Sequence, residues 1–221
     1  MTVVLAALLL TGCAQSVDPI ERLGKKAAQR VHQHGPTPDQ PYRRWGLTAP
    51  LAPAPPRPAA PSAGPGLPPV VDHVRTRDRV VFLTYDHDTH TRRDPGFTTL
   101  VRELRLPVTE FRTPPKPVRY TGLPYAAQRT EICGHRPGSR LLRLPEGTYD
   151  TTTRRAAADC GISALVLWRA STTTGTLTYA RGDHRLTRGD IVQITPTDTT
   201  ARLLRGIQER GLTVGRLEDY L

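Results

Sequence analysis

The sequence predicts an α/β domain built on a mostly parallel sheet, and two observations support this prediction. From Val70 onward, apolar runs of strand length alternate with segments whose apolar residues have helical spacing. The apolar runs are near-continuous, which is typical of strands that helices cover on both faces. An α+β domain with the same elements paired differently is the alternative.

The individual elements follow from local patterns. The predicted strands cover residues 79–85, 108–112, 162–168, 191–195 and 212–214, and the predicted helices cover residues 94–105, 150–158 and 201–210. Asp94 and Asp150 are expected to cap their helices, because a short acidic side chain accepts hydrogen bonds from free backbone N–H groups. Gly161 and Gly211 are expected just beyond the carboxyl ends of the helices over residues 150–158 and 201–210.

The remaining segments after residue 70 are expected to connect these strands and helices. Residues 113–129 contain three prolines near their start and are expected to be mostly loop. Residues 177–186, with Gly182-Asp183 between two short runs, are expected to form a small hairpin. Residues 217–221 are expected to form a final turn.

The amino terminus has the pattern of an export signal. Residues 3–10 form an apolar run that is too short to span a bilayer, and small residues follow it. The sequence LTGC, which ends at Cys13, resembles a bacterial lipobox, in which the cysteine is lipidated. This resemblance implies a signal peptide over residues 1–12, a lipid-anchored tether over residues 13–35 and a location on the extracytoplasmic face of the cell membrane. An uncleaved apolar terminus with a chance cysteine is the alternative.

Proline dominates the next segment. Residues 36–69 hold 12 of the 22 prolines of the chain. Because proline fixes φ and lacks an N–H donor, neither helix nor sheet propagates there, and we expect a disordered, extended linker before a folded domain over residues 70–221. Trp45 and Leu47 interrupt this linker. They either dock on the folded domain or form a motif for another protein.

The charge of the chain restricts its partners only partly. The net charge is +11 and is carried almost entirely by arginine. This balance is compatible with an anionic lipid or an anionic wall polymer as a neighbour. Known nucleic-acid-binding motifs are absent from the sequence, and aromatic residues do not alternate with the arginines. We therefore expect no nucleic-acid partner.

Ionisable residues cluster where the first predicted strand ends. The apolar run of residues 80–83 is followed by Asp86, His87, Asp88 and His90. Such groups at the carboxyl end of a buried strand are typical of a functional site in α/β sheets and barrels. We expect them to lie in one cleft. The alternative is a polar strand exit whose charges are solvated.

Several segments resemble one enzyme family. VVFLTYDHD over residues 80–88 resembles the T-F-D-D-G motif of the polysaccharide deacetylases, which form carbohydrate esterase family 4 with its NodB-homology domain. LRLPEGTY over residues 142–149 is similar to the family's third motif, and residues 188–221 resemble its last strand and helix. The resemblance implies a distorted (β/α) barrel. It also implies a divalent metal such as zinc, and hydrolysis of acetyl groups from cell-wall or extracellular polysaccharide.

The resemblance also implies roles for individual residues. Asp86 takes the position of the catalytic base, and Arg143 that of the residue that orients it. The candidate metal ligands are His87, Asp88 and His135. The histidine pair of the family's second motif is absent, and only 57 residues separate Asp86 from Arg143, so we expect an incomplete barrel.

Two functions of different classes follow. The first is a membrane-anchored deacetylase. The second is an inactive relic or glycan-binding lipoprotein that has lost the metal ligand pair and needs no cofactor. Thr195 favours the second, because it stands where the family has its general-acid histidine.

The two later cysteines leave two possibilities open. An extracytoplasmic compartment tolerates disulfides, so Cys133 and Cys160 are candidates for a bridge. Two separately buried thiols are the alternative.

Overall fold

The computed structural model describes eight segments of the chain. They are residues 40–56, 66–88, 94–113, 118–134, 139–172, 175–182, 184–195 and 198–221. Cys13, His90 and His135 lie outside the described residues, as do the predicted signal peptide and tether. Within the described residues, no helix combines the length and the apolar character that crossing a membrane requires.

The larger of two sheets is organised around its longest strand, β2 (Val80–Asp88). This strand pairs in parallel with three others, which are β3 (Val108–Thr113), β8 (Ile191–Ile194) and β9 (Thr213–Gly215). Two short strands continue the sheet beyond β8, namely β6 (Ala170–Ser171) and β7 (Thr178–Tyr179). Only the β6–β7 pair is antiparallel within the described sheet.

The smaller sheet contains three parallel strands in the order β1–β5–β4. Their bounds are Val70–Val71, Ala164–Val166 and Leu141–Arg143. No strand pairing joins β3 to β4 among the described residues, so the barrel stays open between these two strands. The predicted α/β class with an incomplete barrel is therefore confirmed.

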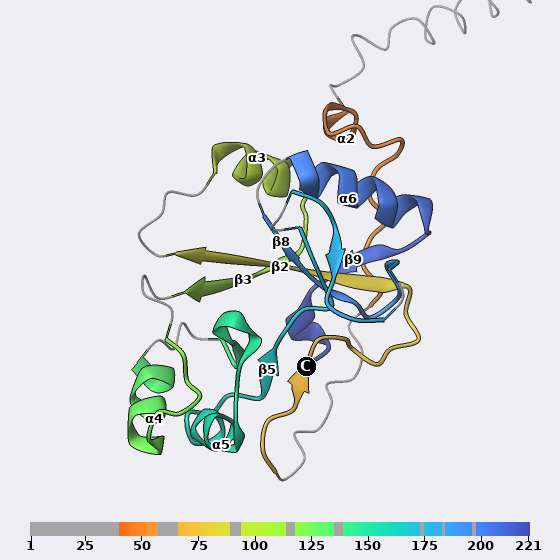
Figure 1. Ribbon diagram of the computed structural model, residues 1–221. Helices are drawn as coiled ribbons and strands as arrows, with labels where there is room; N and C mark the ends of the chain where they lie inside the picture. Colours follow the sequence, from red (N-terminus) through yellow and green to blue (C-terminus); the bar gives the residue numbers. More distant parts are fainter. Residues whose placement is uncertain are drawn as a thin grey trace, which may run out of the picture. The chain divides into compact units, whose positions relative to one another are not determined.

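Helices cover the outer sides of both sheets (Figure 1). The larger sheet is covered by α3 (Pro95–Glu103) and α6 (Asp198–Glu209), and the smaller one lies beside α4 (Tyr125–Gly134) and α5 (Thr151–Asp159). Asp94 and Asp150 cap α3 and α5, as predicted, by accepting the backbone N–H of Phe97 and Thr153 respectively. Two short 3-10 helices complete the domain, η1 (Pro145–Gly147) and η2 (Leu217–Asp219).

The side chains of β2 divide between two cores. Val81, Leu83 and Tyr85 pack with α3 and α6 in the outer core. Val80 and Phe82 belong to the inner core that the two sheets enclose. This alternation is what strand geometry requires, because successive side chains point to opposite faces. It determines which polar residues at the end of β2 can meet.

Three secondary-structure predictions need correction. Residues 125–129, part of the 113–129 segment expected to be mostly loop, belong to α4. Their hydrophobic pattern is weak because the helix buries only Gln128 and Ile132. The strand β7 pairs with β6 rather than within a 177–186 hairpin. The first strand continues to Asp88 instead of ending at Tyr85, because β3 pairs with it along this whole stretch.

Part of the predicted linker segment packs on the folded domain. The compact unit begins at Pro41 rather than at Val70. The amino-terminal strap, residues 41–51, starts with the short helix α2 (Pro41–Arg44) and packs against the outer core. Leu47 is buried in that core, and Trp45 donates a hydrogen bond from Nε1 to Glu103 Oε2 at 2.9 Å. Of the two alternatives for Trp45 and Leu47, the structure has the docked one.

Candidate functional site

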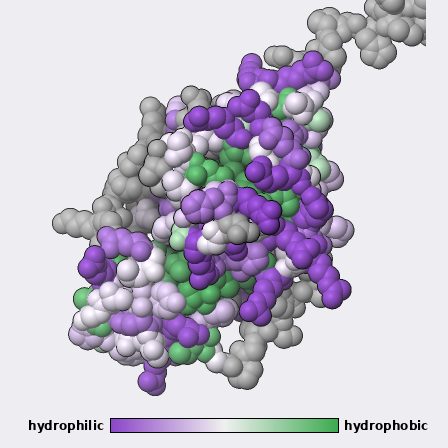
Figure 2. All heavy atoms as spheres, turned by 45° about the vertical axis from the view of Figure 1, so that its right-hand side comes forward, coloured by the Kyte–Doolittle hydropathy of each residue, from purple (hydrophilic) through white to green (hydrophobic). Residues whose placement is uncertain are grey.

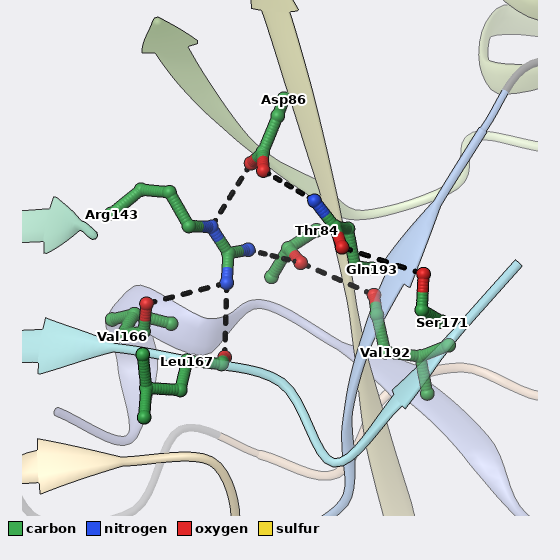
Figure 3. Close-up of polar contacts among 8 residues, drawn as sticks. All are labelled: Thr84, Asp86, Arg143, Val166, Leu167, Ser171, Val192 and Gln193. Atoms are coloured by element: carbon green, nitrogen blue, oxygen red, sulfur yellow. Dashed lines mark hydrogen bonds and ion pairs between the residues drawn. The ribbon is translucent and has the colours of Figure 1, made fainter. Parts of the chain in front are cut away.

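Asp86 and Arg143 come from different sheets and meet where the barrel is open. Asp86 belongs to the carboxyl-terminal half of β2, on the inner face with Thr84. Arg143 is the last residue of β4. Its Nε donates to Asp86 Oδ1 at 3.0 Å (Figure 3). The pair that the family resemblance implies is therefore present in the structure.

Both terminal nitrogens of the guanidinium also donate hydrogen bonds. One terminal nitrogen donates to the carbonyl oxygens of Val166 and Leu167 on and after β5, at 3.3 and 3.0 Å. The other donates to Thr84 Oγ1. The guanidinium carbon lies 4.4 Å from the ring centre of Phe111 and 5.3 Å from that of Trp168. Arg143 thus bonds to both sheets and stacks on aromatic rings at the opening.

The environment of Arg143 is poor in water. Its side chain is only 3% exposed, while that of Asp86 is 18% exposed. Burial lowers the pKa of Arg143, and the carboxylate of Asp86 opposes this shift by favouring the charged form. Because a guanidinium stays charged in proteins, the buried cation depends on Asp86 as its counter-charge.

Gln193 donates a hydrogen bond to the second carboxylate oxygen of Asp86. It lies on β8 in register with Thr84, on the inner face, and its Nε2 donates to Asp86 Oδ2 at 2.6 Å. Its own Oε1 accepts a hydrogen bond from Ser171 Oγ at 3.4 Å. The sequence reasoning missed this residue. The available signal was a single amide inside the apolar run IVQI.

The carboxylate of Asp86 is bound by side chains on both of its oxygens. Each of its oxygens already accepts one hydrogen bond, and the donors are a buried cation and an amide. A proton taken from a water molecule would remove the charge that Arg143 requires. The geometry therefore shows an ion pair that joins the two sheets.

His87 does not join Asp86, contrary to the prediction of a common cleft. Because β2 runs on to Asp88, the two neighbouring side chains point to opposite faces. His87 stacks against Tyr85, with ring centres 5.9 Å apart, on the outer face. Its Nδ1 is buried without a hydrogen-bond partner among the described residues.

The implied metal does not fit the described residues. The candidate ligand His87 lies on the outer face of β2, away from the inner face that carries Asp86. Within the described segments, no three histidine, cysteine or acidic side chains are grouped as a metal site requires. Asp88 lies opposite Thr113 at the end of the β2–β3 pairing, and His135 is outside the described residues.

Thr195 and Glu146, a residue of the LRLPEGTY segment, also have other partners. Thr195, at the position of the general acid, donates from Oγ1 to the Thr172 carbonyl at 3.0 Å. Glu146, in η1, has a positive φ of 55° and pairs with Arg119 at 3.0 Å. Both side chains serve local structure in this arrangement.

A disulfide joins Cys133 on α4 to Cys160 at the carboxyl-terminal cap of α5. The bridge ties together the two helices that cover the smaller sheet. Their contact buries Ile132 and Ala157 in a separate core cluster.

Comparisons with known proteins identify a relative and a fold. No family model matches the chain. An uncharacterized protein from Streptomyces coelicolor is 50% identical over 199 residues, covering 72% of this chain and 79% of the relative. The chain belongs to the same family as this Streptomyces protein.

Solved structures add the fold of this Streptomyces family. A peptidoglycan N-acetylglucosamine deacetylase has a TM-score of 0.56 at 11% identity, covering 69% of this chain and 92% of its own. A chitin deacetylase from Colletotrichum lindemuthianum has a TM-score of 0.54 at 12% identity, covering 71% and 92%. A mutant of a carbohydrate esterase family 4 pseudoenzyme, with restored enzymatic activity, has a TM-score of 0.50 at 15% identity, covering 69% and 71%. The family therefore has a divergent polysaccharide deacetylase fold.

Proposed function

We propose that the chain is a cell-envelope lipoprotein that binds cell-wall or extracellular polysaccharide and does not catalyse the deacetylase reaction. The polysaccharide part rests on fold similarity. Two of the similar structures are named as deacetylases of peptidoglycan N-acetylglucosamine and of chitin. The lipoprotein part rests on the LTGC sequence at Cys13.

One observation carries the non-catalytic part of the proposal. The carboxylate of Asp86 is bound by the buried Arg143 and by Gln193. A base for hydrolysis must accept a proton from water, whereas this carboxylate serves as the counter-charge of a cation that is 3% exposed. His87, on the outer face, supports the same proposal, because it lies away from Asp86.

The second candidate function is the family's hydrolysis itself. The observation in its favour is the same Arg143–Asp86 pair, since the family resemblance gives that arginine the role of orienting the base. The two candidates differ in one respect that can be measured. Hydrolysis requires a bound divalent metal to activate water, and glycan binding does not.

The experiment uses the full-length chain and acetylated chitooligosaccharides, chitin and peptidoglycan. We expect sedimentation with insoluble chitin or peptidoglycan, but not with cellulose, and no acetate release with or without added zinc. Isothermal titration with zinc should show no stoichiometric tight site. Zinc-dependent acetate release that Asp86→Asn abolishes and Asp78→Asn retains would contradict the non-catalytic proposal. Absence of sedimentation with either glycan would contradict the binding proposal.

Lipidation is tested separately in cells. We expect the wild-type chain in the membrane fraction with an acylated Cys13. Cys13→Ser should release the chain to the medium or leave it unprocessed. A membrane fraction and amino terminus that this substitution does not change would contradict the lipoprotein proposal.

A further inference from the structure

Exposed arginines gather at one end of the larger sheet. The loops that lead into its parallel strands all lie at the amino ends of those strands, on the right of Figure 1. These loops are residues 72–79, 104–107, 184–190 and 210–212. Their exposed arginines, which together we call the amino-end surface, are Arg75, Arg77, Arg79, Arg105, Arg185, Arg188 and Arg210.

Backbone contacts hold three of these loops together. Val74 N donates to the Gly189 carbonyl at 2.8 Å, and Gly189 N donates to the Val80 carbonyl at 2.7 Å. A Cβ at Gly189 would lie 2.1 Å from the Val74 carbonyl oxygen, so only glycine permits this approach. The Arg79 guanidinium bonds the carbonyls of Arg210 and Gly211 at 2.5 and 2.9 Å, where α6 ends. The amino-end surface is therefore a fixed part of the fold.

Acidic side chains in the same loops are already engaged. Asp72 pairs with Arg181, and Asp78 accepts a hydrogen bond from Tyr220 at 2.8 Å. Asp190 is fully buried and is bound by Thr187 and His73. Glu209 is an exposed acid beside this surface.

Several guanidinium groups remain available at this end. Arg75, Arg77 and Arg188 form no hydrogen bond or ion pair with another described residue. In Figure 2, which turns this end toward the viewer, strongly hydrophilic side chains line the right-hand part of the molecule. These three arginines therefore leave positive charge without a partner among the described residues.

The amino-terminal strap contacts the carboxyl-terminal ends of the two outer helices. The amino-terminal strap bonds to Glu103, the last residue of α3, through Arg44 and Trp45. Gln208, in the last turn of α6, donates to the carbonyls of Ala49 and Pro50. Because α3 and α6 run opposite to the strands, these helix ends lie toward the strands' amino ends. The described strap thus passes along the carboxyl-terminal ends of both outer helices.

We propose that the amino-end surface binds anionic phospholipid head groups and thereby orients the domain on the membrane. The inference of orientation rests on the proposed lipid anchor. Guanidinium groups match phosphate by paired hydrogen bonds. Their attraction to an anionic membrane acts within a Debye length, so a lipid anchor that keeps the domain near the membrane makes this attraction effective. The carboxyl ends of the strands, where Asp86 lies, then face away from the membrane.

The test measures vesicle binding by the full-length chain carrying Cys13→Ser, so that no covalent lipid contributes. Vesicles of phosphatidylcholine alone are compared with vesicles of equal parts phosphatidylcholine and phosphatidylglycerol, and the first also report any contact made by the apolar amino terminus. The test variant is Arg75→Gln/Arg77→Gln/Arg188→Gln. The matched control, with the same change in net charge, is Arg112→Gln/Arg129→Gln/Arg155→Gln.

We expect tighter binding to the anionic vesicles, and weaker binding as salt rises. Each arginine near the membrane should contribute about fivefold in affinity. The test variant should therefore lose roughly a hundredfold in affinity for anionic vesicles, and the control variant much less. Equal losses in both variants would overturn the proposal, as would equal binding to both kinds of vesicle. Tight binding to poly(glycerol phosphate) without vesicle binding would also overturn it, in favour of a wall polymer. Failure of lipidation in cells would contradict the anchor alone, because the vesicle measurement uses an unlipidated chain.

Discussion

Arg143 on β4 and Asp86 on β2 form an ion pair at 3.0 Å across the open side of the barrel, where no described strand pairing joins the two sheets. Asp86→Ala should lower the free energy of unfolding by about 3–5 kcal/mol, because it leaves a buried guanidinium without its counter-charge. Urea unfolding measures this loss.

A double variant and an exposed pair are the controls for this prediction. Asp86→Leu/Arg143→Met should recover much of the stability, since replacing both charges removes the unpaired cation. Glu146→Ala breaks the exposed pair with Arg119 and should cost at most about 1 kcal/mol. Equal losses for Asp86→Ala and Glu146→Ala would contradict a buried, stabilising pair.

Leu47 tests the position at which the folded unit begins. Its side chain is 4% exposed in the outer core, so Leu47→Ala should destabilise the whole domain by about 3 kcal/mol through the cavity it leaves. Leu67→Ala is the matched control, because Leu67 is 37% exposed and should change stability by less than about 0.5 kcal/mol. Denaturant unfolding followed by tryptophan fluorescence measures both. If Leu47→Ala behaves like Leu67→Ala, the strap is not part of the cooperative unit.

The Cys133–Cys160 bridge should stabilise the domain through the denatured state. It closes a loop with a sequence separation of 27, for which the chain-entropy relation gives about 3.5 kcal/mol. Cys133→Ala/Cys160→Ala should therefore lower the free energy of unfolding by about this amount in urea. Thiol labelling of unfolded, unreduced protein gives an independent reading. Two labelled thiols beyond any at Cys13 would show that the bridge is absent.

Tyr220 gives the domain a dependence on alkaline pH. Its hydroxyl donates to Asp78 at 2.8 Å, and burial together with this hydrogen bond raises the pKa of Tyr220 to about 12. A raised pKa means that the folded state holds this proton more tightly than the unfolded state. The resulting stability is complete below the unfolded pKa of about 10 and is lost as pH rises toward 12.

Urea unfolding at about pH 9 and about pH 11 tests this dependence. The loss of stability between the two values should be smaller in Tyr220→Phe than in the wild type, while Tyr149→Phe, at an exposed position, should behave as the wild type does. An identical loss in Tyr220→Phe and the wild type would contradict the role of Tyr220.

Local patterns predicted the elements whose burial is visible in the sequence itself. The run VVFLTY and the Asp94 and Asp150 caps depend on neighbouring residues only, and the structure confirms them. The end of β2 depends instead on its pairing with β3 up to Asp88, which no local pattern reveals. That difference of three residues changed the face on which His87 lies, and with it the expected cleft.

Other features depended on partners far away in the chain. Leu47 is buried in a core that includes residues of α3 and α6, which lie far behind it in the chain, and the proline-rich composition around it indicated a linker. Gln193 acquires its role only because Asp86 lies beside it on the next strand. The Asp86–Arg143 pair could be predicted from the sequence, because one family motif contains Asp86 and another contains Arg143.

The ion pair across the open barrel has a consequence for genetics. In a cell, a protein weakened by several kcal/mol is degraded more often, and its abundance falls. A strain that carries Asp86→Ala would therefore show the phenotype of a deletion even if no chemistry depends on the carboxylate. Protein levels in such a strain must be compared with those of Asp86→Leu/Arg143→Met, in which the same carboxylate is absent but the fold is retained.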